Sequence, residues 1–294
     1  MDEPATGQVT SADGTLISYD RCGTGTPVVL VHGAFTDRTH PLLREVAAAL
    51  SPWFTVYNYD RRGRGGSGDV RPYAVEREVE DLAALLAEAG GSGGGGPEPA
   101  IGTRAGGPGG SAPGEGGAVL VFGGSSGAAL ALRAVTAGLP IGKLALWEPP
   151  YHVGPGAPDL PADFAERLES LVEEGRPGDA VELFMVRAAE VPAEAVAAMR
   201  SGPGWAGMEA LAHTLAYEAA VMGPRNALPA GPLASISRPT LVLNGGASPG
   251  WMLDAGRAVA AAVPGAEHRI LEGETHAVSS RGLAPELLEF FVAA

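Results

Sequence analysis

The chain has 294 residues, a net charge of −14 from 20 Lys+Arg and 34 Asp+Glu, and 45% apolar residues. The length allows a sizeable core, and the acidic balance argues against a nucleic acid or an anionic membrane as partner, because both need clustered basic residues. A single cysteine, Cys22, excludes an intrachain disulfide and a cysteine-based zinc site. The acidic N-terminus is unlike a signal peptide and no apolar run reaches about 18 residues, so we expect a cytoplasmic protein.

Short apolar runs alternate with amphipathic helical patterns along the chain. Strands are predicted at 16–19, 27–32, 54–60, 118–122, 143–147, 240–244 and 268–272. Helices are predicted at 39–50, 75–89, 126–137, 252–263 and 285–292. The near-continuous apolar run at 27–32 is typical of a buried parallel strand. This alternation predicts a mostly parallel sheet with helices on both faces.

Two stretches interrupt the alternation. Residues 90–117 hold 14 Gly and 4 Pro, which predicts a flexible connection because such a composition cannot form a core. Residues 151–235 lack strand signals, and we expect a helical insertion there. Its three predicted apolar helix faces are Phe164, Leu168, Leu171 and Val172; Val181, Phe184, Met185 and Ala188; and Met208, Leu211, Leu215 and Ala219. Residues 1–150 and 236–294 would then form the core domain.

The sequence Gly123-Gly-Ser-Ser-Gly127 matches the Gly-x-Ser-x-Gly pattern of a nucleophile elbow. It follows a predicted strand and precedes a predicted helix, which is the context that this motif requires. The central Ser125 would sit on a strained turn where neighbouring side chains would clash. The Ser126 N–H would lie at a helix N-terminus, where it could stabilise an oxyanion. We therefore expect Ser125 to be a nucleophile.

A second turn follows the strand at 27–32. There, His32-Gly33 can direct a backbone N–H at the same oxyanion, and we expect Ala34 to be the donor, with Phe35 as the alternative. We expect His32 itself to have a structural role, since it lacks a nearby carboxylate in the sequence. His276 follows the last predicted strand, so its imidazole would reach the carboxyl edge of the sheet. Of the six histidines, His276 has the placement of a general base.

Five motifs together resemble the α/β-hydrolase superfamily over residues 8–294, with the Gly-rich insert omitted. They are Val31–Ala34, Tyr59–Gly68, Phe122–Gly127, Pro239–Gly245 and Gly273–His276. The resemblance implies an α/β-hydrolase fold with a mostly parallel eight-stranded sheet, helices on both faces and a helical cap at 151–235 over the active site. It does not select one reaction.

The chain departs from the family at the usual position of the acid. The family places its acid a few residues beyond the glycine that matches Gly245, where this chain has Ser248. A hydroxyl cannot supply the negative charge that stabilises an imidazolium. Some family members carry the acid at the end of the strand after the nucleophile, which in this chain is Glu148. We therefore expect Glu148 to be the acid, with Asp254 as the alternative.

These residues predict a serine hydrolase that cleaves a small or medium ester, thioester or lactone through an acyl-enzyme, without a metal or organic cofactor. A carbon–carbon bond hydrolase or a cofactor-free perhydrolase could use the same groups. If the acid is lost, the chain could instead be a ligand-binding or biosynthetic scaffold protein. The expected partner is a small apolar substrate, and the oligomeric state is left open. The expected substrate-binding residues are Phe35, Trp147, His152, Met185 and Trp205.

Overall fold

A computed structural model describes residues 4–91 and 118–293 of the chain. Its eight strands form one sheet in the order β1-β2-β4-β3-β5-β6-β7-β8, which confirms the predicted mostly parallel eight-stranded sheet. The strands β1 and β2 pair antiparallel, as do β2 and β4, and the other pairs are parallel. The strands are β1 (Ala5–Thr10), β2 (Leu16–Cys22), β3 (Thr26–Val31), β4 (Phe54–Tyr59), β5 (Val119–Gly124), β6 (Ile141–Trp147), β7 (Thr240–Gly245) and β8 (Glu267–Leu271).

The edge strand β1 is an element that the sequence analysis did not predict. Its sequence, Ala-Thr-Gly-Gln-Val-Thr, contains one large apolar residue, Val9, and most of the strand is exposed or partly exposed. Pairing with β2, in which Val9 lies opposite Ile17, holds it in the sheet. The central strand β3 shows the opposite pattern, because all its residues from 27 to 31 are buried. It pairs with both β4 and β5, as a fully covered parallel strand does.

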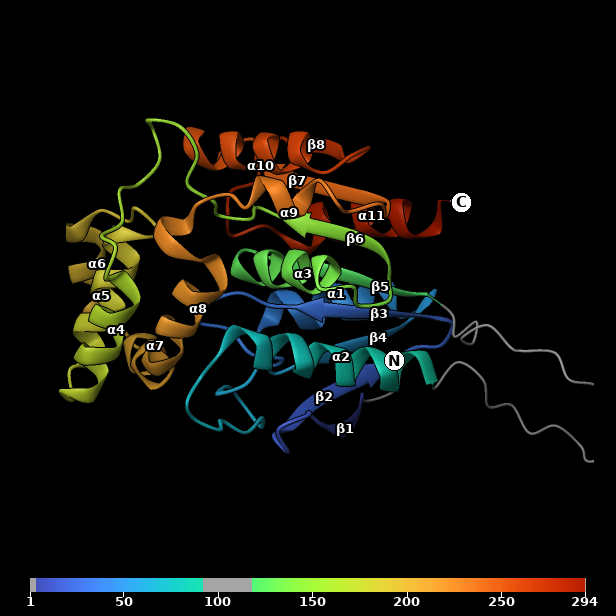
Figure 1. The fold of residues 1–294 in the computed structure, drawn as a ribbon, viewed down its shortest axis with the longest axis horizontal. Helices are drawn as coiled ribbons and strands as arrows, with labels where there is room; N and C mark the ends of the chain where they lie inside the picture. The colour runs from blue at the N-terminus through green and yellow to red at the C-terminus, as the bar shows by residue number, and fades with distance from the viewer. Residues whose placement is uncertain (1–3, 92–117, 294) are drawn as a thin grey trace, which may run out of the picture.

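Helices cover both faces of the sheet (Figure 1). On one face, α1 (Pro41–Leu50) and α11 (Ser280–Val292) share an apolar cluster with β3, β4 and β7. On the other, α2 (Val75–Gly91), α3 (Ser126–Thr136) and α10 (Gly250–Ala262) pack on a second cluster. The final helix starts five residues before the predicted position. It starts early because the Ser279 hydroxyl accepts the Gly282 N–H at 3.0 Å and so caps the helix ahead of Pro285.

The chain between β6 and β7 forms a set of short helices, which we call the helical segment (residues 151–235). They comprise α4 (Phe164–Glu173), α5 (Pro177–Arg187), α6 (Ala193–Arg200), α7 (Trp205–Ala210), η2 (Ala212–Thr214), α8 (Leu215–Met222), η3 (Pro224–Asn226) and α9 (Ala230–Leu233). Figure 1 shows α4 to α8 beyond the end of the sheet toward which β6 points, whereas α9 lies back beside the core, near α10. The third predicted helix is broken at Leu211, whose φ and ψ of −100° and 1° end α7. The segment has its own apolar core around Leu168, Val181 and Leu215.

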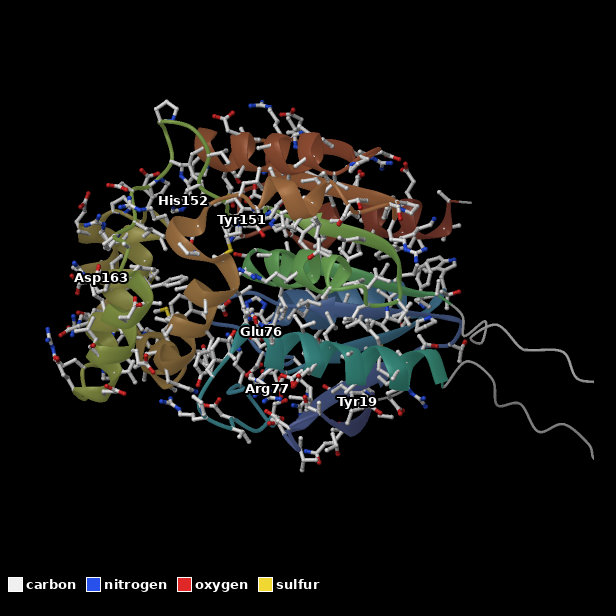
Figure 2. All side chains as sticks on the ribbon, in the orientation of Figure 1. Tyr19, Glu76, Arg77, Tyr151, His152 and Asp163 are labelled. Atoms are coloured by element: carbon white, nitrogen blue, oxygen red, sulfur yellow. The ribbon has the colours of Figure 1, made fainter. Side chains whose placement is uncertain are left out.

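Figure 2 shows Tyr151 and His152 where the chain passes from β6 to the helical segment. The predicted flexible connection at 90–117 lies outside the described residues except for its first two, which end α2. Within 4–91 and 118–293, no helix has the length and apolarity needed to cross a bilayer.

Candidate active site

Ser125 occupies a sharp turn between β5 and α3. Its φ of 57° and ψ of −128° are unusual for a residue with a side chain. The flanking glycines make this turn possible, since a Cβ on Gly123 would lie 2.7 Å from the Ala128 Cα, and one on Gly127 would lie 2.3 Å from the Val31 carbonyl oxygen. The Ser125 N–H donates to the Trp147 carbonyl at 2.8 Å. The strand–turn–helix context that the motif predicted is therefore present.

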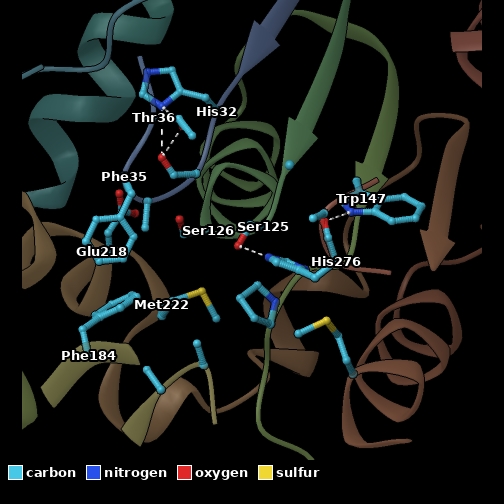
Figure 3. A pocket seen from close by; sticks show the side chains of 18 of the residues that line it. His32, Phe35, Thr36, Ser125, Ser126, Trp147, Phe184, Glu218, Met222 and His276 are labelled. Carbon is cyan, nitrogen blue, oxygen red and sulfur yellow. Dashed lines mark hydrogen bonds between the residues drawn. The ribbon is translucent and has the colours of Figure 1, made fainter. Parts of the chain in front are cut away.

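His276 reaches Ser125 from the loop between β8 and α11 (Figure 3). Its Nε2 lies 3.2 Å from the Ser125 Oγ. The indole Nε1–H of Trp147 donates to the His276 carbonyl at 3.1 Å and so ties this loop to the end of β6. The 43% exposed His276 side chain is thus held at the carboxyl edge of the sheet, where the sequence placed it.

Glu148 completes a line of contacts behind His276. It follows β6 with a φ of 42°, and its side chain is fully buried. One carboxylate oxygen lies 2.8 Å from His276 Nδ1, and the other accepts the Gly245 N–H at 2.8 Å. The structure therefore brings together Ser125, His276 and Glu148. Gly245 is a contact that the sequence analysis missed, although it ends one of the family-like motifs.

The environment of Glu148 favours its charged form. Burial raises the pKa of this carboxyl, but the hydrogen bonds with His276 and the Gly245 N–H and the nearby Ser248 hydroxyl outweigh burial and bring the pKa below its ordinary value. Ser248, which stands where the family has an acid, is therefore a neighbour of the acid. The alternative acid, Asp254, is not brought to the site: it is 60% exposed on α10 and pairs with Arg257 at 2.9 Å.

Ala34, Phe35 and Ser126 line the cavity in front of Ser125, and each has a backbone N–H group. These N–H groups make no hydrogen bond within the described part of the chain. Gly33 is required here, because a Cβ on it would lie 2.9 Å from the Ser125 Cβ. Phe35 has a φ of 58°, so this loop is held in a strained conformation beside the nucleophile.

His32, which follows β3, connects its own loop to the loop that follows β4. Its Nε2 accepts the Arg61 N–H at 3.2 Å, and its Nδ1 lies 3.0 Å from the Gly33 carbonyl oxygen. Burial lowers the pKa of His32 well below its ordinary value, and the nearby Arg64 and Arg61 charges lower it further. A neutral ring that donates from Nδ1 and accepts at Nε2 fits these contacts.

A cavity of about 450 Å³ opens in front of Ser125 and extends under the helical segment. Of the expected substrate-binding residues, Phe35, Trp147 and Met185 line it. His152 and Trp205 are not among the described residues that line the cavity. The ring of His152 packs edge-on against Trp251, 5.3 Å between centroids, and Trp205 is buried in the core of the helical segment.

Several wall residues were missing from the expected set. They include Phe164, Phe184, Ala219, Met222, Asn226 and Trp251. Phe164, Phe184 and Met222 are aromatic or methionine residues of the helical segment, but this sequence signal did not separate wall from core. Figure 3 shows Phe184 and Met222 facing the Ser125–His276 pair across the cavity.

Glu218 on α8 lines the same cavity and is fully buried. It contacts Arg61 at 3.0 Å and also pairs with Arg64; we call these two the buried arginine pair. Since both arginines follow β4, this cluster ties the helical segment to the core. Its charges are compensated within the protein, so Glu218 offers little free charge to a ligand.

Comparison with known proteins agrees with this fold. A family model described as "Alpha/beta hydrolase family" matches residues 28–286. An alpha/beta hydrolase structure from Sphaerobacter thermophilus is 47% identical, with 97% of this chain and 100% of that chain covered and a TM-score of 0.83. A thermophilic esterase from Thermogutta terrifontis shares the fold at 22% identity, 94% and 92% coverage and a TM-score of 0.60. An uncharacterized hydrolase of Bacillus subtilis, YraK, is 37% identical over 78 residues, which cover 26% of this chain and 28% of that protein's length.

Proposed function

Because the chain belongs to the alpha/beta hydrolase family, we propose that it is a serine hydrolase that cleaves small or medium esters, thioesters or lactones. One observation carries the proposal: Ser125 Oγ, the His276 ring and the Glu148 carboxylate form a continuous line of contacts of 3.2 and 2.8 Å. A serine hydroxyl is a weak nucleophile alone, and an adjacent oriented base activates it. The contact between Glu148 and His276 also counts against the alternative that the chain is a scaffold protein that has lost its acid.

The proposed reaction begins when Ser125 Oγ attacks the carbonyl carbon. His276 Nε2 takes the hydroxyl proton, and Glu148 stabilises the imidazolium that forms. The free N–H groups of Ala34 and Ser126 hold the developing oxyanion. When the carbon–oxygen or carbon–sulfur bond breaks, His276 returns the proton to the leaving group. A water molecule, deprotonated by His276, then attacks the acyl-enzyme; the bond to Ser125 Oγ breaks, His276 returns the proton to Ser125 Oγ, and the acid is released.

The wall of the cavity supports an uncharged, largely apolar substrate. Apolar side chains predominate in it, and among the described wall residues there is no lysine or arginine. An anionic group in the cavity would therefore lack a compensating cation. We further propose that the helical segment acts as a cap, since residues of α4, α5 and α8 supply the wall opposite Ser125.

Labelling with a fluorophosphonate probe tests the proposal, because such probes react with activated serines. The wild type should be labelled, and Ser125→Ala and His276→Ala should not. Ser235→Ala removes an exposed serine hydroxyl and should leave labelling unchanged. Hydrolysis of p-nitrophenyl butyrate by the same four proteins should follow the labelling. A folded wild type that neither reacts with fluorophosphonates of two sizes nor cleaves the ester would overturn the proposal.

A further inference from the structure

Asn226 contributes to the largely apolar wall of the cavity and carries an amide side chain. The residue is 5% exposed and lines the 450 Å³ cavity as well as an adjoining cavity of about 180 Å³. Phe164 and Ala219 also line both cavities, so Asn226 lies in the wall that the two cavities share. Its side-chain oxygen and nitrogen make no hydrogen bond to any described residue. A buried amide without a partner is costly unless a ligand or water satisfies it.

Three other polar side chains in the wall are unavailable to a ligand. The Ser126 hydroxyl and the Trp251 indole N–H are sealed from the cavity, and Glu218 is held by the buried arginine pair. The Asn226 amide, in contrast, is not among the sealed polar atoms. It can therefore donate and accept hydrogen bonds in the open space of the cavity.

The backbone at Arg225 and Asn226 has a left-handed conformation. Their φ values are 55° and 51°, a region that is unfavourable for arginine but that asparagine adopts more readily than most residues with side chains. Two hydrogen bonds fix the position: the Asn226 N–H donates to the Gly223 carbonyl at 3.0 Å, and its carbonyl accepts the His152 N–H at 2.8 Å. Strain of this kind persists where the surrounding structure imposes it, often at ligand-binding positions.

We propose that Asn226 is a specificity-determining residue whose amide binds an uncharged oxygen, a hydroxyl or a carbonyl, carried by the substrate away from its scissile bond. The substrate class is then an oxygenated ester with an apolar body, such as a hydroxy ester or a keto ester. The inference rests on the proposed function for its reaction. Its recognition step rests on the free amide and on the wall's lack of cationic side chains among the described residues.

The test compares pairs of esters that differ in one oxygen. Methyl esters of straight-chain acids with four to eight carbons are paired with their terminal hydroxy and keto analogues, and acetates of alkyl alcohols with acetates of diols. The wild type should prefer the oxygenated member by roughly three- to tenfold in kcat/KM at one chain length, the range expected for one hydrogen bond. In Asn226→Gly, which tolerates the positive φ, the ratio should fall to about one.

Two further variants keep the test interpretable. Arg225→Gly relaxes the neighbouring positive φ without removing the amide, and it should keep the wild-type ratio. Asn226→Asp retains the size of the side chain and can still accept from a hydroxyl, but it cannot donate to a ketone. It should lose the keto preference and retain part of the hydroxy preference. Equal ratios in the wild type and Asn226→Gly at every chain length would overturn the proposal.

Binding separates this inference from the proposed reaction. In Ser125→Ala, the intact esters can be titrated by the fluorescence of Trp147 and Trp251, which line the cavity. The oxygenated ester should bind three- to tenfold more tightly, and adding Asn226→Gly should remove the difference. If the wild type cleaves no ester but this difference appears, the reaction is wrong and the role of Asn226 stands. If catalysis occurs without the difference in binding or kcat/KM, the role of Asn226 is wrong.

Discussion

Replacing Glu148 with glutamine keeps the size of the side chain and removes its charge. In the protein, one carboxylate oxygen accepts the Gly245 N–H at 2.8 Å and the other lies 2.8 Å from His276 Nδ1. The glutamine carbonyl oxygen would face the Gly245 N–H, so its NH₂ group would face Nδ1. His276 would then carry its proton on Nε2, the atom that faces Ser125. A ring protonated there cannot take the serine proton.

The distance between the Glu148 carboxylate and His276 Nδ1 determines how much stabilisation of the imidazolium the substitution removes. At 2.8 Å and an effective dielectric constant of about 20, Coulomb's law gives at most about 6 kcal/mol of attraction between carboxylate and imidazolium. The 43% exposure of His276 reduces this value through solvent screening. We therefore expect kcat/KM for p-nitrophenyl butyrate to fall about a thousandfold in Glu148→Gln, which corresponds to about 4 kcal/mol.

The matched control is Asp254→Asn, which removes an exposed carboxylate that pairs with Arg257. It should keep the wild-type kcat/KM, and circular dichroism should show that both variants are folded. Retention of more than a tenth of the activity in Glu148→Gln would refute the reasoning. A loss in Asp254→Asn alone would assign the acid to α10 instead.

Three further predictions concern the packing and charge around the site. Glu218→Gln leaves the buried arginine pair undercompensated and should lower the free energy of unfolding by about 3–5 kcal/mol in urea titrations, whereas Asp254→Asn should change it by less than about 1 kcal/mol. Gly127→Ala would place a Cβ 2.3 Å from the Val31 carbonyl oxygen; we expect a loss of about 1–3 kcal/mol in stability and slower fluorophosphonate labelling. Because the pKa of Glu148 is lowered in the folded state, its contribution to stability is present above its ordinary pKa of 4.5 and is lost as the pH falls through the folded value. Urea titrations below pH 4.5 should therefore show a smaller loss of stability in Glu148→Gln than in the wild type, and equal losses would contradict the pKa direction.

Apolar patterning predicted most of the sheet because buried parallel strands need continuous apolar runs. Thus β3 was predicted from 27–32, and the structure ends it at Val31 because His32 turns to meet Arg61. The edge strand β1 escaped prediction, since pairing with β2 holds it and its own side chains carry little apolar signal. The break at Leu211 also escaped, because the apolar spacing across α7 and α8 is helical while the backbone between them is not.

The reacting groups were easier to predict than the wall of the cavity. Motif and strand order together bring Ser125, Glu148 and His276 to one edge of the sheet, because parallel strands β5, β6 and β8 all end there. The wall depends on how the short helices pack. Trp205 and Phe184 have similar sequence signals, yet one fills the core of the helical segment and the other faces the cavity. Asn226 gave no signal, since its proposed role is argued from its contacts and its backbone conformation, which a sequence does not display. Local sequence motifs therefore predict the reacting groups. The wall of the cavity, in contrast, depends on how the helical segment packs in three dimensions.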